Sequence, residues 1–237
     1  MSTVEPRFGM ETHLARDLVQ LKKMVLSMGG LVEEAFQNAC RGLTQGDEAF
    51  AARVPSADRQ IDLHELEIDE FGMKLLALYQ PVAGDLRFIV ATLKITNDLE
   101  RIGDLAASIA DRAVLLARLP EFGGPLWLDE MAEGTSQMLR DALDALVSGN
   151  AELAREVCSR DDTIDDLNRR MFEHVKERIK EDSESVDAGI ALLSAARSIE
   201  RSADLATNIA EDVVFLVEAV DIRHPNLEDK AQIPDRW

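Results

Sequence analysis

The chain has 237 residues, of which 30% are charged and only 5% are aromatic, and its formal net charge is −19. Such a charge argues against a nucleic-acid partner, which would require a basic face, and against direct adsorption to an anionic membrane surface. Leu, Ala, Val and Ile supply most of the apolar content, which suits an all-helical protein better than a sheet protein. The sequence therefore predicts an all-α protein, long enough for one large domain or two modest ones.

The two cysteines, Cys40 and Cys158, belong to no C-x-x-C motif, so free thiols in a reducing compartment are expected. The opening segment MSTVEPRFGMETH has no basic stretch followed by an apolar one. No run of the sequence approaches the roughly 18 apolar residues of a membrane span. These features predict a soluble, cytoplasmic protein without direct membrane insertion.

The first predicted unit spans residues 8–120 and holds three long helices. Its first helix runs over about 10–46, where apolar residues recur at steps of three and four positions. A short helical piece follows, and we expect it to end at Pro55. The second long helix covers about 56–79, and the third follows the break QPVAG at 80–84.

The pattern restarts in a second unit at residues 126–220, after a linker rich in Gly and Pro. Its segments LVSGNAELAREV and DDTID resemble LTQGDEAFAARV and DRQID of the first unit. The predicted helices of this unit cover about 128–147, 159–181 and 185–219. We therefore expect two tandem antiparallel three-helix bundles related by an internal repeat, with a C-terminal tail at 221–237.

Carboxylates four positions apart recur at matching places in the two units. NDLERIGDLAASIAD contains Glu100 and Asp104, and RSIERSADLATNIAED contains Glu200 and Asp204. Side chains at this spacing share one helical face, with Cβ atoms about 6 Å apart, and like charges there destabilise an isolated helix by a few tenths of a kcal/mol. A bound cation would offset that cost.

The second helix of each unit carries its own acidic pair, Asp58 and Asp62 in the first unit and Asp161 and Asp165 in the second. Because helices joined by a short turn pack antiparallel, we expect each pair to face the acids of the following helix. The sequence thus predicts one four-carboxylate metal site in each unit, with three more oxygen ligands that could extend a site to a cluster. The predicted metal ligands are Asp58, Asp62, Glu100, Asp104, Asp111, Asp161, Asp165, Glu200, Asp204, Asn208 and Glu211. All-oxygen ligation suits hard cations such as Mg²⁺, Mn²⁺, Ca²⁺ or ferric iron.

Two other interpretations of the acidic pairs remain open. One is a solvated acidic face, in which Lys94, Arg101, Arg197 and Arg201 pair with the acids locally. The other is a carboxylate-bridged multimetal enzyme or a metal-handling helical protein. The Glu-x-x-His motif that ferritin-like dimetal proteins carry on two helices is absent, which counts against the enzyme. Since no phosphate-binding glycine motif and no nucleophile–base pair is evident, we predict no catalytic residues.

Two long segments resemble the PhoU family of bacterial phosphate-specific transport accessory proteins. They are QPVAGDLRFIVATLKITNDLERIGDLAASIA at 80–110 and RSIERSADLATNIAEDVVFLVEAVDIRH at 197–224, and the resemblance extends over about residues 8–224. The paired acids match the E(D)-x-x-x-D signature of that family. Ser202 and Ala203 stand where the family usually has Ile-Gly, a change that alters packing but leaves the acids in place.

The resemblance implies a fold of two three-helix bundles, iron or zinc clusters at the acidic positions, and a homodimer. Mg²⁺ and Mn²⁺ stay open as alternatives, because the family does not fix the metal. It also implies a non-enzymatic adaptor between the ATPase subunit of a phosphate ABC transporter and a sensor histidine kinase. Such a protein would repress the phosphate-starvation response when phosphate is plentiful, and would reach the inner membrane only through its protein partners.

Overall fold

The computed structural model describes residues 8–119, 122 and 126–223, and within them the chain forms helices and no strands. The α-helices are α1 (Phe8–Gln45), α2 (Glu48–Ala51), α3 (Val54–Tyr79), α4 (Ala83–Leu116), α5 (Leu126–Ser148), α6 (Ala151–Cys158), α7 (Asp161–Glu181) and α8 (Val186–Glu218). A 3-10 helix, η1 (Ser183–Ser185), leads into α8. The predicted all-α class is confirmed. The predicted tail beyond 223 and most of the predicted linker lie outside the described residues.

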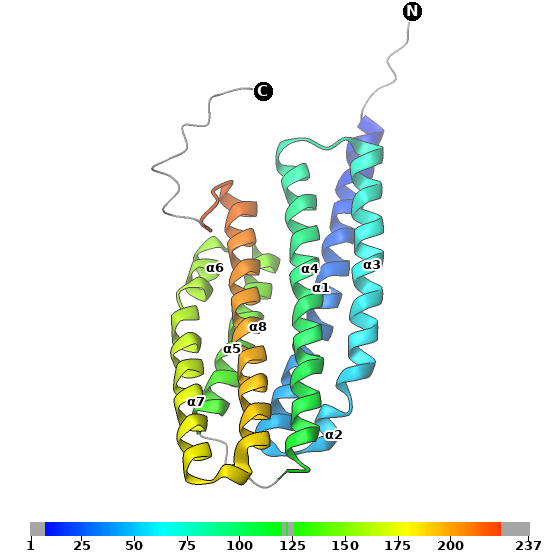
Figure 1. Cartoon of the computed structure of the whole chain (residues 1–237). Helices are drawn as coiled ribbons and strands as arrows, with labels where there is room; N and C mark the ends of the chain where they lie inside the picture. Colours follow the sequence, from blue (N-terminus) through cyan, green and yellow to red (C-terminus); the bar gives the residue numbers. More distant parts are fainter. Residues whose placement is uncertain (1–7, 120–121, 123–125, 224–237) are drawn as a thin grey trace, which may run out of the picture.

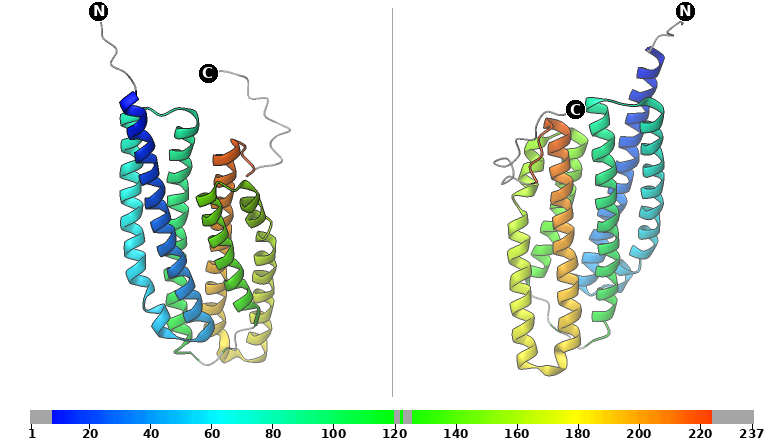
Figure 2. Two further views of the ribbon diagram at one scale, coloured as in Figure 1. Left: turned by 180° about the vertical axis from the view of Figure 1, so that it is seen from behind. Right: turned by 45° about the horizontal axis from the view of Figure 1, so that its top comes forward.

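The long helices form two bundles that stand side by side (Figure 1). α1, α3 and α4 make the first bundle, and α5, α7 and α8 make the second, in agreement with the predicted internal repeat. α4 and α8 lie in contact at the centre, while α1 and α5 come forward when the molecule is seen from behind (Figure 2). The face in Figure 1 is therefore built from α7, α8, α4 and α3, in that order.

The same turn ends the first helix of each bundle. Gly46 and Gly149 have φ angles of +65° and +63°, in the left-handed region that glycine enters without steric cost. The next residue then caps a short helix: Asp47 accepts a hydrogen bond from the Ala49 amide, and Asn150 accepts two. The similar segments LTQGDEAFAARV and LVSGNAELAREV thus form the same turn twice.

The role expected for Pro55 was wrong. The short helix α2 already ends at Ala51, and Pro55 lies in the first turn of α3. Proline is tolerated there because the amide that it lacks would have no partner inside the helix, and its fixed φ angle suits helical backbone. Pro55 therefore starts the second long helix instead of ending the short one.

Buried apolar side chains of both bundles form one contiguous core cluster. Side chains such as Phe36 of α1, Ile61 of α3 and Ile199 of α8 are completely buried. The recurring apolar positions seen in the sequence are the positions that face this core. No helix in the described part of the chain is long and apolar enough to cross a membrane.

Gly42 is expected to be a stability determinant. A Cβ atom at Gly42 of α1 would lie 3.1 Å from the backbone nitrogen of Ala51 and 3.0 Å from its Cβ atom, so α2 would have to move. Gly42→Ala should therefore lower the free energy of unfolding by about 1 kcal/mol or more, despite the better helix propensity of Ala. The matched change Gly30→Ala meets no atom within 4 Å and should raise it by up to about 1 kcal/mol. Urea unfolding followed by circular dichroism measures both, and equal effects of the two changes would contradict the expectation.

Candidate metal centre

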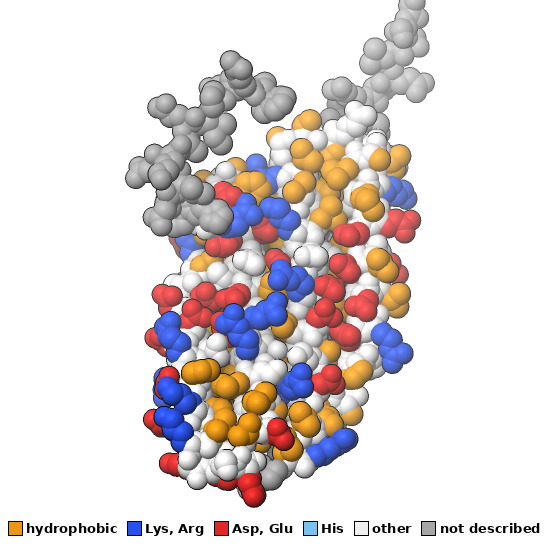
Figure 3. Space-filling model, viewed as in Figure 1, with side chains coloured by type: hydrophobic (Ala, Val, Ile, Leu, Met, Phe, Trp, Pro, Cys, Tyr) orange, Lys and Arg blue, Asp and Glu red, His pale blue; other side chains and the backbone are white. Residues whose placement is uncertain are grey.

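Two groups of carboxylates lie on the face that α7, α8, α4 and α3 build. The first cluster comprises Asp58 and Asp62 of α3 with Glu100 and Asp104 of α4; the second comprises Asp161 and Asp165 of α7 with Glu200 and Asp204 of α8. In each cluster the acids of one helix interact electrostatically with an acid of the other helix, as the antiparallel packing of consecutive helices predicts. Figure 3 shows acidic side chains on both sides of this face, with basic side chains along the middle.

The second cluster is the more tightly gathered. Oxygen atoms of Asp165, Glu200 and Asp204 all lie within 4.8 Å of one another, close enough for a single cation to contact all three. Glu200 is buried; its Oε1 atom accepts a hydrogen bond from Arg197, and its Oε2 atom is buried without a hydrogen-bond partner. A buried carboxylate oxygen without a partner is costly, so this position would be stabilised by a cation.

The first cluster also contains a buried carboxylate oxygen without a hydrogen-bond partner, Asp58 Oδ1. It lies near Gly103 of α4, where an added Cβ would be 3.8 Å from this oxygen and 3.1 Å from Ile61 Cδ1. The absence of a side chain at Gly103 thus lets α3 approach α4 and brings Asp58 toward the acids of α4.

Burial, followed by repulsion between neighbouring negative charges, raises the pKa values of several carboxyls in these clusters. Burial, followed by the neighbouring Asp104, raises the pKa of Glu100 to about 7, and burial, followed by Asp204, raises that of Asp161 to about 6. Burial is also the main cause of the raised pKa values of Asp58 and Glu200. A bound cation would balance the negative charge of these carboxylates, because a positive charge favours the ionised form of every carboxylate around it. The donor set therefore fits a hard cation held by carboxylate oxygens.

The two clusters differ in their flanking residues, of which Glu65, Asn97 and Thr207 were not predicted from the sequence. Glu65 adds a fifth acid to the first cluster and interacts with Asn97 of α4, whereas the position equivalent to Asn97 in the second bundle is Arg197. In the second cluster Thr207 donates a hydrogen bond to Asp161, with 3.4 Å between Oγ1 and Oδ1. Glu65 follows Asp62 by three positions, so helical spacing alone could have identified it.

Three of the predicted ligands lie outside these two groups of four. Asn208 lines a pocket that residues of α3, α4 and α8 form, and Glu211 acts electrostatically on Cys158. Asp111 is exposed on α4. Their assignment as metal ligands stays a prediction.

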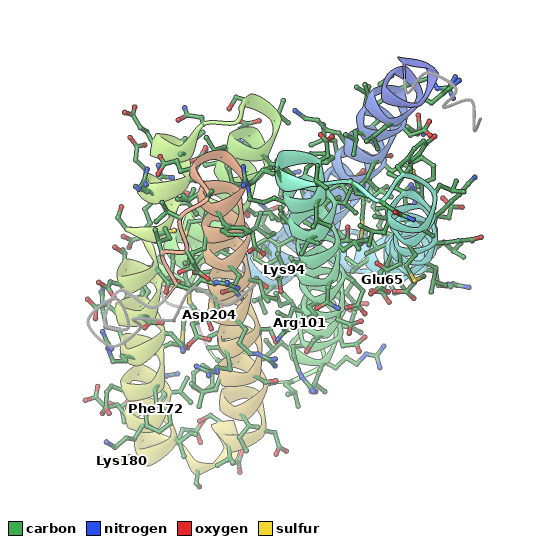
Figure 4. All side chains as sticks on the ribbon, turned by 90° about the horizontal axis from the view of Figure 1, so that it is seen from above. Glu65, Lys94, Arg101, Phe172, Lys180 and Asp204 are labelled. Atoms are coloured by element: carbon green, nitrogen blue, oxygen red, sulfur yellow. The ribbon has the colours of Figure 1, made fainter. Side chains whose placement is uncertain are left out.

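The alternative of a solvated acidic face depends on local basic partners. Arg197 does pair with Glu200, but Arg101 pairs with Asp98, 3.5 Å away, and Lys94 pairs with Asp212 at the same distance. Asp98 and Asp212 belong to neither cluster. Two of the four expected partners thus neutralise other acids, which leaves the clusters with an excess of negative charge. In Figure 4, Arg101 lies between Glu65 on one side and Asp204 on the other.

Metal-free protein is expected to lose stability as the pH rises through the range in which Glu100 titrates. The pKa of Glu100 is about 7 in the folded chain and close to 4.5 in an unfolded one, so the folded state holds a proton more tightly. That contribution is fully present below about pH 4.5 and is lost as the pH rises through about 7. In buffer with a chelator, Glu100→Gln should flatten the decline in the free energy of unfolding, measured with urea. Glu177→Gln, an exposed change on α7, is the control; a wild-type stability that rises over this range would contradict the expectation.

Known proteins resemble this chain in sequence and in structure. The family described as PhoU domain matches residues 25–113 and again residues 128–213. A phosphate-specific transport system accessory protein PhoU homologue of Pseudomonas putida is 38% identical over 213 residues, covering 90% of this chain and 83% of the relative. The corresponding homologue of Aquifex aeolicus is 35% identical, covering 92% of this chain and 99% of the relative.

Solved structures agree with the sequence comparison. The crystal structure of PhoU from Pseudomonas aeruginosa superposes with a TM-score of 0.85 at 34% identity, covering 87% of this chain and 99% of that one. The phosphate transport system regulatory protein PhoU from Streptococcus pneumoniae gives a TM-score of 0.80 at 28% identity, with coverages of 88% and 99%. The family match falls once on each bundle, and the relatives cover nearly the whole chain. The chain therefore belongs to the PhoU family.

Proposed function

We propose that this chain is a regulatory adaptor of phosphate homeostasis and not an enzyme. It would contact the ATPase subunit of a phosphate ABC transporter and a sensor histidine kinase, and would repress the phosphate-starvation response when phosphate is plentiful. The observation that carries this proposal is the family match on both bundles, together with relatives named as accessory proteins of phosphate-specific transport. A cytoplasmic location, a homodimer and attachment to the inner membrane through protein partners belong to the same proposal.

The character of the surface supports binding to proteins. Exposed apolar side chains occur on α3, in the connection after it and at the start of α4, including Leu66, Met73, Leu78, Val82 and Leu86. Apolar side chains grouped on a surface are typical of protein contact sites. The net charge of −19 also favours an encounter with the Lys- and Arg-rich cytoplasmic loops of a membrane transporter.

The proposal includes a cation at each cluster, held by Asp58, Asp62, Glu100 and Asp104 in the first bundle and by Asp161, Asp165, Glu200 and Asp204 in the second. Iron or zinc is proposed from the family resemblance, with Mg²⁺ or Mn²⁺ as alternatives. The buried oxygens of Asp58 and Glu200 that lack hydrogen-bond partners support a bound cation, whichever of these metals it is. When bound, the cation would neutralise the crowded carboxylates and so fix α3 against α4 and α7 against α8.

The alternative of a multimetal enzyme receives less support from the histidines. His64 makes a hydrogen bond between its Nδ1 atom and the Gln60 carbonyl, 2.8 Å away, on its own helix. His174 packs edge-on against Trp127 and Phe122. The described clusters are thus all-oxygen, which suits binding of a hard cation more than the mixed nitrogen and oxygen sites of ferritin-like oxidases.

The test is a deletion of this gene in the source bacterium. In phosphate-rich medium the deletion strain should show high alkaline phosphatase output, and the intact gene should restore low output. Complementation with Glu100→Gln and Glu200→Gln, against Glu177→Gln as control, then asks whether the clusters matter for repression. Output that stays low in the deletion strain would contradict the proposed role.

A further inference from the structure

A pocket with a basic lining separates the two acidic clusters. It has a volume of 430 Å³ and lies between α4 and α8, at the junction of the two bundles. Three arginines line it, Arg101 of α4 with Arg197 and Arg201 of α8, and Asp104 is the one carboxylate among its described lining residues. Its volume falls within the range of small-molecule sites, about 300–1,000 Å³. An excess of arginine in one pocket is notable in a chain whose net charge is −19.

The arginines retain donors for a ligand. The side chains of Arg101 and Arg197 are 47% and 62% exposed, and each contacts one acid of its own helix, Asp98 and Glu200 respectively. A guanidinium group carries five N–H donors, so one such contact leaves others available. Guanidinium groups bind the oxygens of a phosphate group through paired hydrogen bonds, so the available donors suit such a ligand.

Serine hydroxyls complete the polar lining. Ser108 of α4 and Ser194 and Ser198 of α8 line the same pocket. Ser198 Oγ lies 3.5 Å from Ser108 Oγ, and Arg112 Nε donates to Ser194 Oγ at 3.3 Å. Hydroxyl groups can donate to an anion as well as accept, so they add neutral donors beside the arginines. Apart from Leu105, the described lining is polar.

The internal repeat provides a comparison within the molecule. A second pocket, of 680 Å³, is lined by residues of α3, α4 and α8 and by Arg223, and several of its lining positions are equivalent in the repeat to positions of the first pocket. The equivalent pairs include Lys94 and Ser194, Asn97 and Arg197, and Asp98 and Ser198. In this second pocket Lys94 is paired with Asp212, Asp69 and Asp98 add negative charge, and Arg223 adds positive charge. The crossing of α4 and α8 therefore does not itself require arginine at position 197, because the equivalent position in the second pocket holds Asn97.

We propose that the pocket of Arg101, Arg197 and Arg201 binds a phosphate-type oxyanion, either free inorganic phosphate or the phosphate group of a small phosphorylated metabolite. The arginines supply charge and paired donors, and the serines supply neutral donors. This inference rests on the side chains of the pocket and does not depend on the proposed regulatory role. It is tested on the purified full chain, so its failure and the failure of that role are distinguishable.

Equilibrium dialysis against radiolabelled inorganic phosphate, at low ionic strength and with a chelator, measures the binding. The chelator prevents a cation on the carboxylates from binding the phosphate itself. One saturable phosphate per chain is expected, with sulfate as competitor, since both anions present tetrahedral oxygens. ATP and ADP in a second series of competitions distinguish the sources: displacement by nucleotide at lower concentration than by phosphate assigns the site to a phosphorylated metabolite.

Three variants make the assignment specific. Arg197→Asn, which introduces the residue found at the equivalent Asn97, and Arg201→Gln should each weaken binding about tenfold or more, because each removes charged donors to the ligand. Arg169→Gln makes the same change of charge on the exposed side of α7 and should leave binding unchanged. Circular dichroism spectra that match the wild type show that the variants fold. Absence of saturable binding of phosphate and nucleotide, or equal binding by all three variants, would overturn the proposal.

Discussion

Protein in which Asp165→Asn, Glu200→Gln and Asp204→Asn are combined is expected to lose cation binding by the second bundle. The oxygens of these three acids lie within 4.8 Å of one another. Replacing the carboxylates by amides keeps the shape of the side chains but removes their charge. A cation at one hundred times its dissociation constant stabilises the folded chain by about 2.7 kcal/mol. For a chain of this size, that corresponds to a rise in melting temperature of about 5–10 °C for each site, which the variant should lose for one site.

The metal-free proteins should differ in the opposite direction. Burial, followed by repulsion from neighbouring acids, raises the pKa values of Glu200 and Asp204. Without a cation, the amides remove both costs of holding charged carboxylates there, so the metal-free variant should be at least as stable as the wild type. Differential scanning calorimetry with and without Mn²⁺, Zn²⁺ or Fe²⁺, together with metal analysis of the dialysed protein, measures both effects. Glu177→Gln is the control. An unchanged metal content and an unchanged melting shift in the triple variant would exclude the second cluster as the binding site.

Phe36→Ala is expected to be the most destabilising single truncation of the first bundle. Phe36 is completely buried and is the largest of the fully buried side chains in the described core. Removing it loses the transfer free energy of the ring and leaves a cavity, at a cost of about 3–5 kcal/mol. That is a large fraction of the about 5–15 kcal/mol by which a typical protein is stable.

Urea unfolding followed by circular dichroism measures this loss. Phe36→Leu keeps most of the apolar volume and should cost much less than Phe36→Ala, which separates the cavity from a general intolerance of substitution. A loss below about 1 kcal/mol for Phe36→Ala would mean that α1, α3 and α4 can close around the vacant space. In that case the first bundle is more plastic than its dense core indicates.

The sequence by itself determined the helices and their repetition. Apolar periodicity predicts which residues form the core, because the period of a helix is fixed by its backbone geometry. The paired turns at Gly46 and Gly149 were recognisable because a left-handed residue and a following cap leave a local sequence pattern. Pro55 was misjudged because proline is compatible with the start of a helix as well as with the end of the preceding one.

The acidic clusters could be predicted because their members repeat within single helices and the connections between those helices are short. The tertiary structure alone decided what lies between α4 and α8. The pairing of Lys94 with Asp212, and the meeting of Arg101 with Arg197 and Arg201, depend on how one helix is shifted along the other. That shift is set by the packing of side chains from distant parts of the chain, so it cannot be predicted from the periodicity of a single helix.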